Sequence, residues 1–329
     1  MTPTSAHGVR RDPQSKIRWC VVTLVAILLL ATPAAAQHRV ASTASQRVQV
    51  FADDGHHLAL WSKRPAGRPR GAILLLHGRT WSALPNFDLQ VPGQRVSMMA
   101  ALVARGYAVY ALDQRGYGAT PRDSSQWLTP SRAASDALVV LRWIARREGG
   151  TMRPALFGYS QGSLTSMLAA LRDSSAMSAL VLYGFPRNVM TDTGPPLVDP
   201  VALARRRTTI AGAGEDFITP ESTPPGVREA YARAAVAADP IRTDWRGEAE
   251  WRALDPAALR VPVLVINGER DPYAARANLP AFMARVSGVD RSWVVLARAD
   301  HAAHLERQRE FVDAVVGFIA RHAAAPRTR

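Results

Sequence analysis

The stretch RPALFGYSQGSLTS, residues 153–166, places a short apolar run directly before Ser160, with Gly158 and Gly162 two positions away on either side. A buried strand ending at Phe157 and a helix beginning near Ser163 leave only a few residues for the connection. The tightest connection holds the serine at its apex in a strained backbone conformation, and side chains at the two glycine positions would collide with the turning chain. The pattern G-x-S-x-G therefore predicts a strand–turn–helix elbow that lifts a serine hydroxyl above one edge of a sheet.

The rest of the chain supplies strands and helices for such a sheet. Alternating Val48 and Val50, a turn at 53–55, and alternating Leu58 and Leu60 predict an antiparallel hairpin. Near-continuous apolar runs, which are typical of parallel strands buried on both faces, follow at 72–78, 107–113, 154–160, 179–185, 261–268 and 293–299. Helical patterns lie between or after them, at 94–106, 131–150 and 308–322. The alternation predicts an α/β fold: a doubly wound, mostly parallel sheet with an N-terminal antiparallel hairpin.

One interval breaks this rhythm. Residues 186–256 are rich in proline, contain helix-like pieces such as GVREAYARAAVAA, and lack a buried-strand run. We expect an inserted helical cap or lid there, between an N-terminal half of the core at 37–185 and a C-terminal part at 257–329.

The first 36 residues have the pattern of an export signal. Four basic residues precede a thirteen-residue apolar run, WCVVTLVAILLLA, and Ala34 and Ala36 supply the small residues that signal peptidases accept. The run is shorter than the roughly 20 residues that a membrane-spanning helix needs. We expect cleavage near Ala36, a secreted or periplasmic mature protein, and no stable membrane insertion afterwards; an uncleaved N-terminal anchor is the alternative.

Composition restricts the partners and cofactors. The net charge is +14, and removing the leader's four bases and one acid leaves +11, but nearly all the bases are dispersed arginines. We expect no nucleic-acid partner, and the composition does not indicate an oligomeric state. The single cysteine, Cys20, lies within the leader, so the mature chain has no disulfide and no thiolate metal site. We expect neither a cofactor nor a metal ion.

An activated serine needs a base, and the base needs an orienting acid. Asp271 follows the strand pattern VPVLVING, and His301 follows the next one, WVVLARA. Because the carboxyl ends of parallel strands meet at one edge, these side chains are expected to converge on Ser160. The N–H of Gln161 and an N–H of the loop after His77-Gly78, that of Arg79, are the expected donors to an oxyanion.

Other residues compete for these roles. His304, three residues after His301, is a second candidate base, and Glu269, two residues before Asp271, is a second candidate acid. Asp300 is expected to be a loop or capping residue, and His77 to brace its loop. Asp113 and Arg115 are expected to hold turns. Four aromatic residues are candidates for either a pocket or the core: Trp81, Tyr159, Trp245 and Trp251.

With these residues in place, the chain resembles the α/β-hydrolase superfamily. The landmarks are LHGRTW (76–81), LDQRGYGAT (112–120), GYSQG (158–162), NGERDPYA (267–274) and ADHAAHLE (299–306), in the family's order. The resemblance implies a nucleophile at Ser160, an acid at Asp271 and a base at His301, with a cap in the insertion. In some subfamilies the loop after the His-Gly pair contains a proline. The loop after His77-Gly78 has none, so the sequence around Arg79 departs from the pattern of those subfamilies.

The resemblance implies a serine hydrolase that cleaves a carboxylic ester, or a related acyl bond, of a small molecule through an acyl-enzyme. An aminopeptidase-like peptidase or an acyltransferase on the same three residues remains open, as does a non-catalytic binding protein of the same fold. Serine at the nucleophile position disfavours the dehalogenase and epoxide-hydrolase chemistries of the superfamily. Neither the acyl-chain length nor the substrate can be read from the sequence.

Overall fold

The structure, a computed structural model, describes residues 1–2, 44–185, 198–274, 279–287 and 290–322. The chain divides into two units, Met1–Val40 and Ala41–Arg329, and the fold described below belongs to the second. The predicted leader, apart from its first two residues, and positions 186–197 of the predicted cap lie outside the described residues. Within the ranges given, none of the helices combines the length and apolar character that a bilayer crossing demands.

An eight-stranded sheet forms the centre of the fold, in the order β1-β2-β4-β3-β6-β7-β9-β10. The predicted hairpin is β1 and β2, which pair antiparallel, and β2 also runs antiparallel to β4. From β4 to β10 all neighbours are parallel. The strands are β1 (Gln46–Phe51), β2 (His57–Lys63), β3 (Gly71–Leu76), β4 (Tyr107–Leu112), β6 (Ala155–Tyr159), β7 (Leu180–Tyr183), β9 (Val263–Gly268) and β10 (Arg291–Leu296). All six continuous apolar runs are therefore strands, as predicted.

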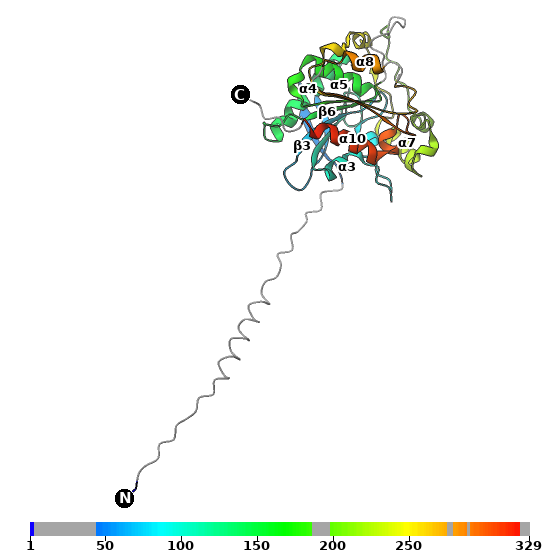
Figure 1. The fold of residues 1–329 in the computed structure, drawn as a ribbon. Helices are drawn as coiled ribbons and strands as arrows, with labels where there is room; N and C mark the ends of the chain where they lie inside the picture. Colours follow the sequence, from blue (N-terminus) through cyan, green and yellow to red (C-terminus); the bar gives the residue numbers. More distant parts are fainter. Residues whose placement is uncertain (3–43, 186–197, 275–278, 288–289, 323–329) are drawn as a thin grey trace. The chain divides into compact units, whose positions relative to one another are not determined.

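Helices cover both faces of this sheet (Figure 1). One face packs against α4 (Pro130–Arg147), α5 (Gln161–Arg172) and α8 (Leu279–Arg285). The other face packs against α3 (Met98–Ala104) and α10 (Gln308–Ala320). The inner strands are buried on both sides because each face supports its own apolar core, which is why their sequences do not alternate. The doubly wound α/β class is confirmed.

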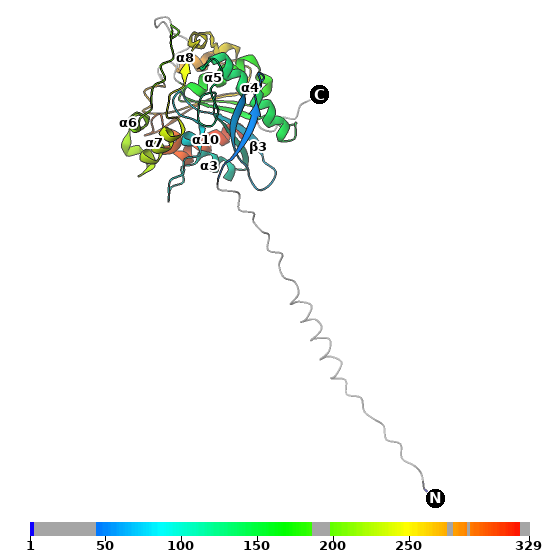
Figure 2. The same cartoon turned by 180° about the vertical axis from the view of Figure 1, so that it is seen from behind.

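The described part of the insertion contains several short helices. It contains α6 (Ile210–Gly214) and α7 (Val227–Ala238), which lie side by side (Figure 2), and the 3₁₀ helices η2 (Pro220–Ser222) and η3 (Glu248–Ala253). A two-residue strand, β8 (Asp244–Trp245), pairs with β5 (Trp127–Leu128), and a strand this short leaves no apolar pattern to detect. The boundaries 186 and 256 remain a prediction. The remaining short helices are α2 (Ala83–Phe87), η1 (Ser174–Ala176), η4 (Pro256–Ala258) and α9 (Ala303–Glu306).

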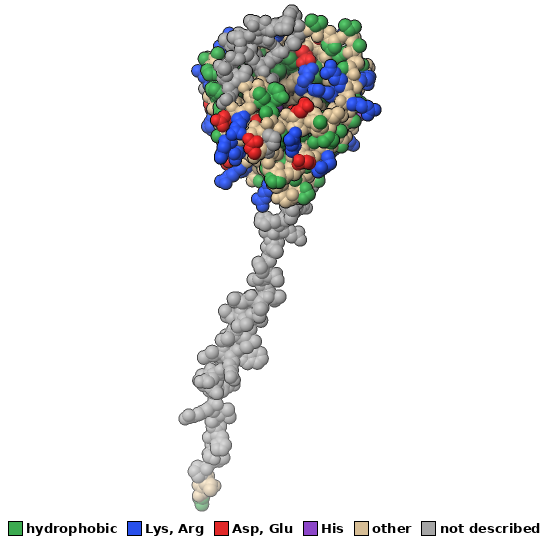
Figure 3. All heavy atoms as spheres, turned by 90° about the vertical axis from the view of Figure 1, so that its right-hand side faces the viewer, with side chains coloured by type: hydrophobic (Ala, Val, Ile, Leu, Met, Phe, Trp, Pro, Cys, Tyr) green, Lys and Arg blue, Asp and Glu red, His purple; other side chains and the backbone are tan. Residues whose placement is uncertain are grey.

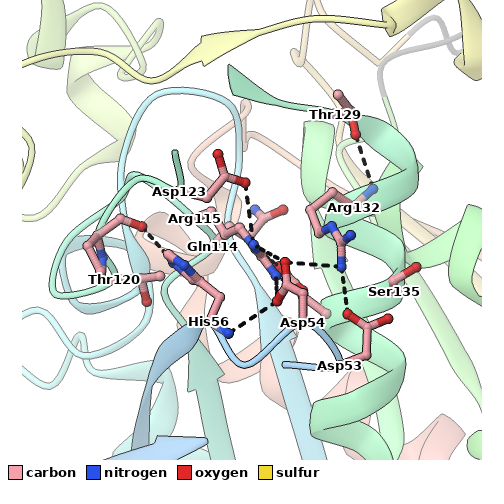
Figure 4. A network of polar contacts seen from close by, with 12 residues as sticks. Asp53, Asp54, His56, Gln114, Arg115, Thr120, Asp123, Thr129, Arg132 and Ser135 are labelled. Carbon is pink, nitrogen blue, oxygen red and sulfur yellow. Dashed lines mark hydrogen bonds and ion pairs between the residues drawn. The ribbon is translucent and has the colours of Figure 1, made fainter. Parts of the chain in front are cut away.

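A buried arginine fastens the N-terminal hairpin to the core (Figure 4). Arg115 is only 2% exposed, and its guanidinium donates to Asp136 of α4 and to Asp54 in the hairpin turn, at 2.7–2.9 Å. Asp123 lies 3.3 Å from the same group. Nearby, the Asp113 carboxylate accepts hydrogen bonds from the backbone of α2 and of the following turn. Both residues therefore hold turns, as the sequence analysis expects.

Charged side chains are mixed on the surface drawn in Figure 3, where acidic groups lie between the basic ones. Several arginines are paired with neighbouring carboxylates, for example Arg142 with Asp173 and Arg285 with Asp255, each at 2.7 Å. In each of these pairs a carboxylate offsets the positive charge of one arginine.

Candidate active site

Ser160 stands at a sharp turn between β6 and α5. Its φ and ψ are 53° and −122°, a region that non-glycine residues seldom occupy and that costs about 1–3 kcal/mol. A Cβ atom on Gly158 would lie 2.2 Å from the carbonyl oxygen of Gly162, and one on Gly162 would lie 2.4 Å from that of His77. Only glycine fits at either position. The helix begins at Gln161, two residues before the predicted start, so the turn is even tighter than expected.

Asp271 and His301 form a buried pair. The Nδ1 atom of His301 donates to Oδ2 of Asp271 at 2.8 Å, and the other carboxylate oxygen accepts the backbone N–H groups of Tyr273 and Ala274 at 2.9 and 3.2 Å. Asp271 follows β9 and His301 follows β10, as the sequence predicts. Because Nδ1 is occupied by the carboxylate, Nε2 is the nitrogen left to accept a proton.

Ser160 and His301 line the same cavity, which has a volume of about 490 Å³. The edge of the sheet contributes Gly78, Arg79 and Gln161, and the insertion contributes a second set that includes Arg207, Asp216, Glu248 and Trp251. Of the four aromatic candidates, Trp81, Tyr159 and Trp251 line the cavity, whereas Trp245 does not. The structure thus brings the predicted nucleophile, base and oxyanion donors to one cavity between the sheet and the insertion.

Glycine also permits the close packing around the imidazole. Gly184, directly after β7, has a φ of +56° and donates its N–H to the carbonyl oxygen of Ile266. A Cβ atom there would lie 2.9 Å from Cε1 of His301 and 3.4 Å from Oδ2 of Asp271. The sequence analysis missed this residue, because a glycine after a strand is too common to signal a close approach.

The two expected oxyanion donors are joined through their side chains. Gln161 is the first residue of α5, where backbone N–H groups have no partner within the helix. The Arg79 guanidinium donates to Gln161 Oε1 at 2.8 Å and forms a two-pronged ion pair with Glu248 of η3. Tyr117 donates its hydroxyl hydrogen to the Arg79 carbonyl oxygen. The loop that carries the Arg79 N–H is therefore tied to both the helix and the insertion.

His77 braces this loop, as expected. Its Nδ1 donates to the Gly78 carbonyl oxygen at 2.9 Å, and its Nε2 accepts from the backbone N–H of Gln114 at 3.1 Å. Complete burial lowers the pKa of His77 to about 4, so the ring is neutral and this bonding pattern persists at neutral pH.

The competing base and acid are engaged elsewhere. His304 is buried outside the cavity lining; its Nε2 bonds the carbonyl oxygen of Asn86 at 2.9 Å, and its Nδ1 lies 3.1 Å from the Tyr183 hydroxyl. Burial lowers the pKa of His304 to about 3. Glu269 accepts the N–H of Arg298 at 2.8 Å, while His301 takes Asp271 as its partner. The geometry thus favours His301 and Asp271 over their rivals.

Asp300 connects the insertion to the loop that carries His301. Its Oδ1 caps the backbone N–H of Ala302 at 2.9 Å, and its Oδ2 accepts the N–H of Thr219, in the insertion, at 2.5 Å. The side chain is fully buried. Asp300 is thus the capping residue that the sequence analysis expects, and it also anchors the insertion.

A further carboxylate, Asp216, faces the cavity from the insertion. Burial raises its pKa, while the charges of His301 and Arg242 and a hydrogen bond from Tyr231, at 3.3 Å, act in the opposite direction. No motif marked this residue, since it sits in a segment whose fold could not be read from the sequence. In the part of the chain that the structure describes, no three His, Cys, Asp or Glu side chains are grouped as a metal site requires.

Comparison with known proteins places the chain in a family. Residues 67–308 match the family described as serine aminopeptidase, S33. Over 276 residues, 78% of this chain and 91% of the relative, the chain is 26% identical to a monoacylglycerol lipase of Mycolicibacterium smegmatis. It is 31% identical to a haloalkane dehalogenase of Mycobacterium marinum over 72% of this chain and 81% of that one.

A thermophilic esterase from Thermogutta terrifontis has a similar fold. The TM-score is 0.58 at 20% identity, and the match covers 85% of this chain and all of the esterase. At this identity the likeness concerns the fold alone. The chain belongs to the serine aminopeptidase S33 family and is an α/β-hydrolase enzyme.

Proposed function

We propose that the protein is a serine hydrolase that cleaves a carboxylic ester of a small molecule through an acyl-enzyme, with Ser160, His301 and Asp271 as its catalytic residues. The observation that carries the proposal is the 2.8 Å contact between His301 Nδ1 and Asp271 Oδ2 beside the cavity that Ser160 also lines. A serine that shares a cavity with an imidazole, where the imidazole is bonded to a buried carboxylate, is the set of groups that can activate a hydroxyl.

In the acylation step, His301 Nε2 takes the proton of Ser160 as its oxygen attacks the ester carbonyl carbon. The resulting tetrahedral oxyanion is stabilised by the N–H groups of Gln161 and Arg79, and Asp271 stabilises the imidazolium. When the bond to the alcohol breaks, His301 returns the proton to the leaving oxygen. An acyl group then remains on Ser160.

In the deacylation step, His301 takes a proton from water, which attacks the acyl carbon and forms a second oxyanion in the same place. Collapse of this intermediate returns the proton to Ser160 and releases the acid. An alcohol acceptor in place of water would make the same residues an acyltransferase, so the reaction outcome depends on which nucleophile reaches the acyl-enzyme.

The serine also argues against haloalkane substrates, although one relative is a haloalkane dehalogenase. Displacement of a halide by Ser160 would give an alkyl ether, which has no carbonyl carbon for water to attack. The enzyme could not turn over. An ester or amide leaves an acyl group on the serine, and that intermediate can be hydrolysed.

The test is turnover of 4-nitrophenyl esters of graded acyl length by the purified protein, beside Ser160→Ala. We expect this variant to lose at least about a thousandfold in kcat. Ser166→Ala is the matched control, because this buried hydroxyl lies in the same helix and has no hydrogen-bond partner. Near-full activity of Ser160→Ala, or failure of the native protein to react with a fluorophosphonate, would overturn the proposal and favour a binding protein.

A peptidase acting on free N-termini is the second candidate, favoured by the family match and by the two carboxylates, Glu215 and Asp216, that line the cavity. An ionised carboxylate in the cavity lining would attract the ammonium group of such a substrate. Aminoacyl-arylamides turned over faster than short-chain aryl esters would establish this activity in place of the esterase.

A further inference from the structure

One guanidinium in the cavity wall has no acidic partner. Arg242 lines the cavity that contains Ser160, and it forms no ion pair with any carboxylate that the structure describes. Its Nη2 donates to the Thr80 hydroxyl oxygen at 3.1 Å, and Thr80 lines the same cavity. The charged end of this side chain therefore reaches the cavity wall next to Arg79, which precedes Thr80 in the chain.

The other donors of Arg242 are accessible. Within the described residues, neither Nε nor Nη1 has a hydrogen-bond partner. Some partnerless side-chain atoms in this structure are fully enclosed, as Nε1 of Trp251 is, but neither nitrogen of Arg242 is among them. Because Arg242 is half-buried and these nitrogens are not enclosed, the guanidinium presents open N–H groups at the cavity wall.

A second arginine comes from the neighbouring segment of the insertion. Arg207 forms an antiparallel bridge with Ile241, which precedes Arg242 in the chain. The Arg242 N–H supports this bridge by donating to the Arg206 carbonyl oxygen at 2.8 Å. Arg207 is exposed, lines the cavity and also forms no ion pair with a described carboxylate. The bridge thus holds the backbones of two unpaired arginines side by side at the cavity.

The acidic residues of the cavity do not neutralise this pair. Glu248 is engaged by the guanidinium of Arg79 through two contacts. Burial raises the pKa of Asp216, and the charge of His301 lowers it more than the charge of Arg242 does. Asp216 therefore interacts more strongly with the proposed base than with Arg242. An anion beside Arg242 would gain an attraction that no described carboxylate supplies at ion-pair distance.

The geometry and the local charges favour a carboxylate over other anions. The planar N–H groups of a guanidinium match the two oxygens of a carboxylate, and such charge-assisted bonds are roughly twice as strong as neutral ones. Glu215 and Asp216 also line the cavity, and they would repel a dianion such as a phosphate monoester more strongly than a monoanion.

We infer that Arg242, assisted by Arg207, forms a specificity subsite for a carboxylate of the substrate. The preferred substrates are then esters that also carry one carboxylate group, such as hemiesters of dicarboxylic acids. Neutral esters of the same size do not use the charge of this subsite. This inference rests on the proposed esterase function and names the substrate class of that same site.

The experiment compares esters that are matched in size and differ in charge. The acyl arm contains monoethyl glutarate, the neutral ethyl 4-carbamoylbutanoate and the cationic ethyl 4-(trimethylammonio)butanoate. The alcohol arm contains 4-(butanoyloxy)butanoate and 4-(butanoyloxy)butanamide. Each ratio of kcat/KM is divided by the ratio of the uncatalysed hydrolysis rates. We expect the native protein to prefer the carboxylate over the amide by about tenfold in at least one arm.

Arg242→Gln removes the charge and keeps a polar side chain, so it should lower this preference to about twofold or less. Arg242→Lys keeps the charge without the planar fork and should retain part of the preference. Arg207→Gln should lower the preference less than Arg242→Gln does. Arg233→Gln is the matched control, because this exposed arginine of α7 lies outside the cavity lining, and the preference should be unchanged.

Thermal unfolding and fluorophosphonate labelling establish that each variant is folded. If Arg242→Gln does not fold, Arg242→Lys and Arg207→Gln take its place, and an unchanged preference in both of them contradicts the subsite. The comparison of substrates on the native protein needs no variant.

A native preference below twofold in both arms overturns the inference, and so does an unchanged preference in Arg242→Gln. Faster turnover of the trimethylammonium ester than of monoethyl glutarate also overturns it, and would assign the cavity to cations through Glu215 and Asp216. In each case, turnover of the neutral esters that disappears in Ser160→Ala leaves the esterase proposal standing. Persistence of turnover in Ser160→Ala refutes the esterase mechanism instead, so the two failures are distinguishable.

Discussion

The backbone of Gly184 lies so close to the imidazole of His301 that a Cβ atom at position 184 would be 2.9 Å from Cε1. The same Cβ would lie 3.1 Å from Nδ1, the nitrogen that bonds Asp271. Because Gly184 has no side chain, the His301 ring can occupy the position in which its Nδ1 bonds Asp271.

Gly184→Ala should displace the ring and lower kcat/KM by about a hundredfold, since misplacing a reacting group by about 1 Å has effects of this size. The measurement is ester turnover, together with a thermal unfolding curve. Gly317→Ala in α10, where nothing lies within 4 Å of an added Cβ, is the control and should keep full activity. A Gly184→Ala protein with more than half of the native rate would show that the ring position is not critical.

The two histidines three residues apart should respond differently to mutation. His301→Ala should lower kcat by about a thousandfold or more, whereas His304→Gln should keep most of the activity and lower Tm by several degrees. His304 is buried and neutral, and both of its ring nitrogens are occupied by Asn86 and Tyr183. The reverse pattern of losses in kcat would make His304 the base.

The ion pair between Glu248 and Arg79 should support the oxyanion loop. Glu248→Gln weakens the hold on the Arg79 side chain, so we expect kcat to fall about tenfold, less than the loss of an oxyanion donor would cause. Fluorophosphonate labelling should slow in parallel. Glu250→Gln is the control, because this residue in the same 3₁₀ helix contacts Ser131 and Arg172, away from the loop. If Glu248→Gln and Glu250→Gln lowered kcat equally, the loss would come from disturbing the 3₁₀ helix and not from weakening the ion pair with Arg79.

Glu306 should make stability depend on pH. Burial raises the pKa of Glu306 from 4.5 to about 8, while its carboxylate accepts the N–H of Asp300. Below pH 4.5 the group is protonated in both the folded and the unfolded chain. As the pH rises from 4.5 towards 8, Glu306 loses its proton in the unfolded chain but keeps it in the folded chain. Deprotonation therefore favours the unfolded chain, and the free energy of unfolding falls over this pH range.

Glu306→Gln cannot ionise and should therefore match the native Tm at pH 4.5 but exceed it by about 2–4 °C at pH 8.5. Thermal unfolding at the two pH values measures the difference. If Glu306→Gln had a lower Tm than the native protein at pH 8.5, ionisation of the Glu306 carboxyl would not be destabilising the folded chain.

The strands and the elbow were predictable because their signals are local. Strands buried on both faces have continuous apolar runs, and the close contacts at Gly158 and Gly162 arise within one short segment. The pairing of Asp271 with His301 followed from the rule that parallel strands end at one edge.

The missing parts of the site depend on contacts between distant segments. Arg79 and Glu248 are 169 positions apart, and nothing near either residue indicates the other. Asp216 and Trp251 reach the cavity because the insertion folds over it, and proline-rich short helices have no periodic pattern from which that path could be derived.

The hydrogen bond from Thr219 to Asp300 sets a rule for exchanging caps between related enzymes. A transplanted segment would have to present a main-chain amide at this point, and proline could not. Without that donor, a fully enclosed carboxylate beside His301 would lose a partner, and a chimera intended to accept new substrates would be impaired next to the residue proposed as its general base.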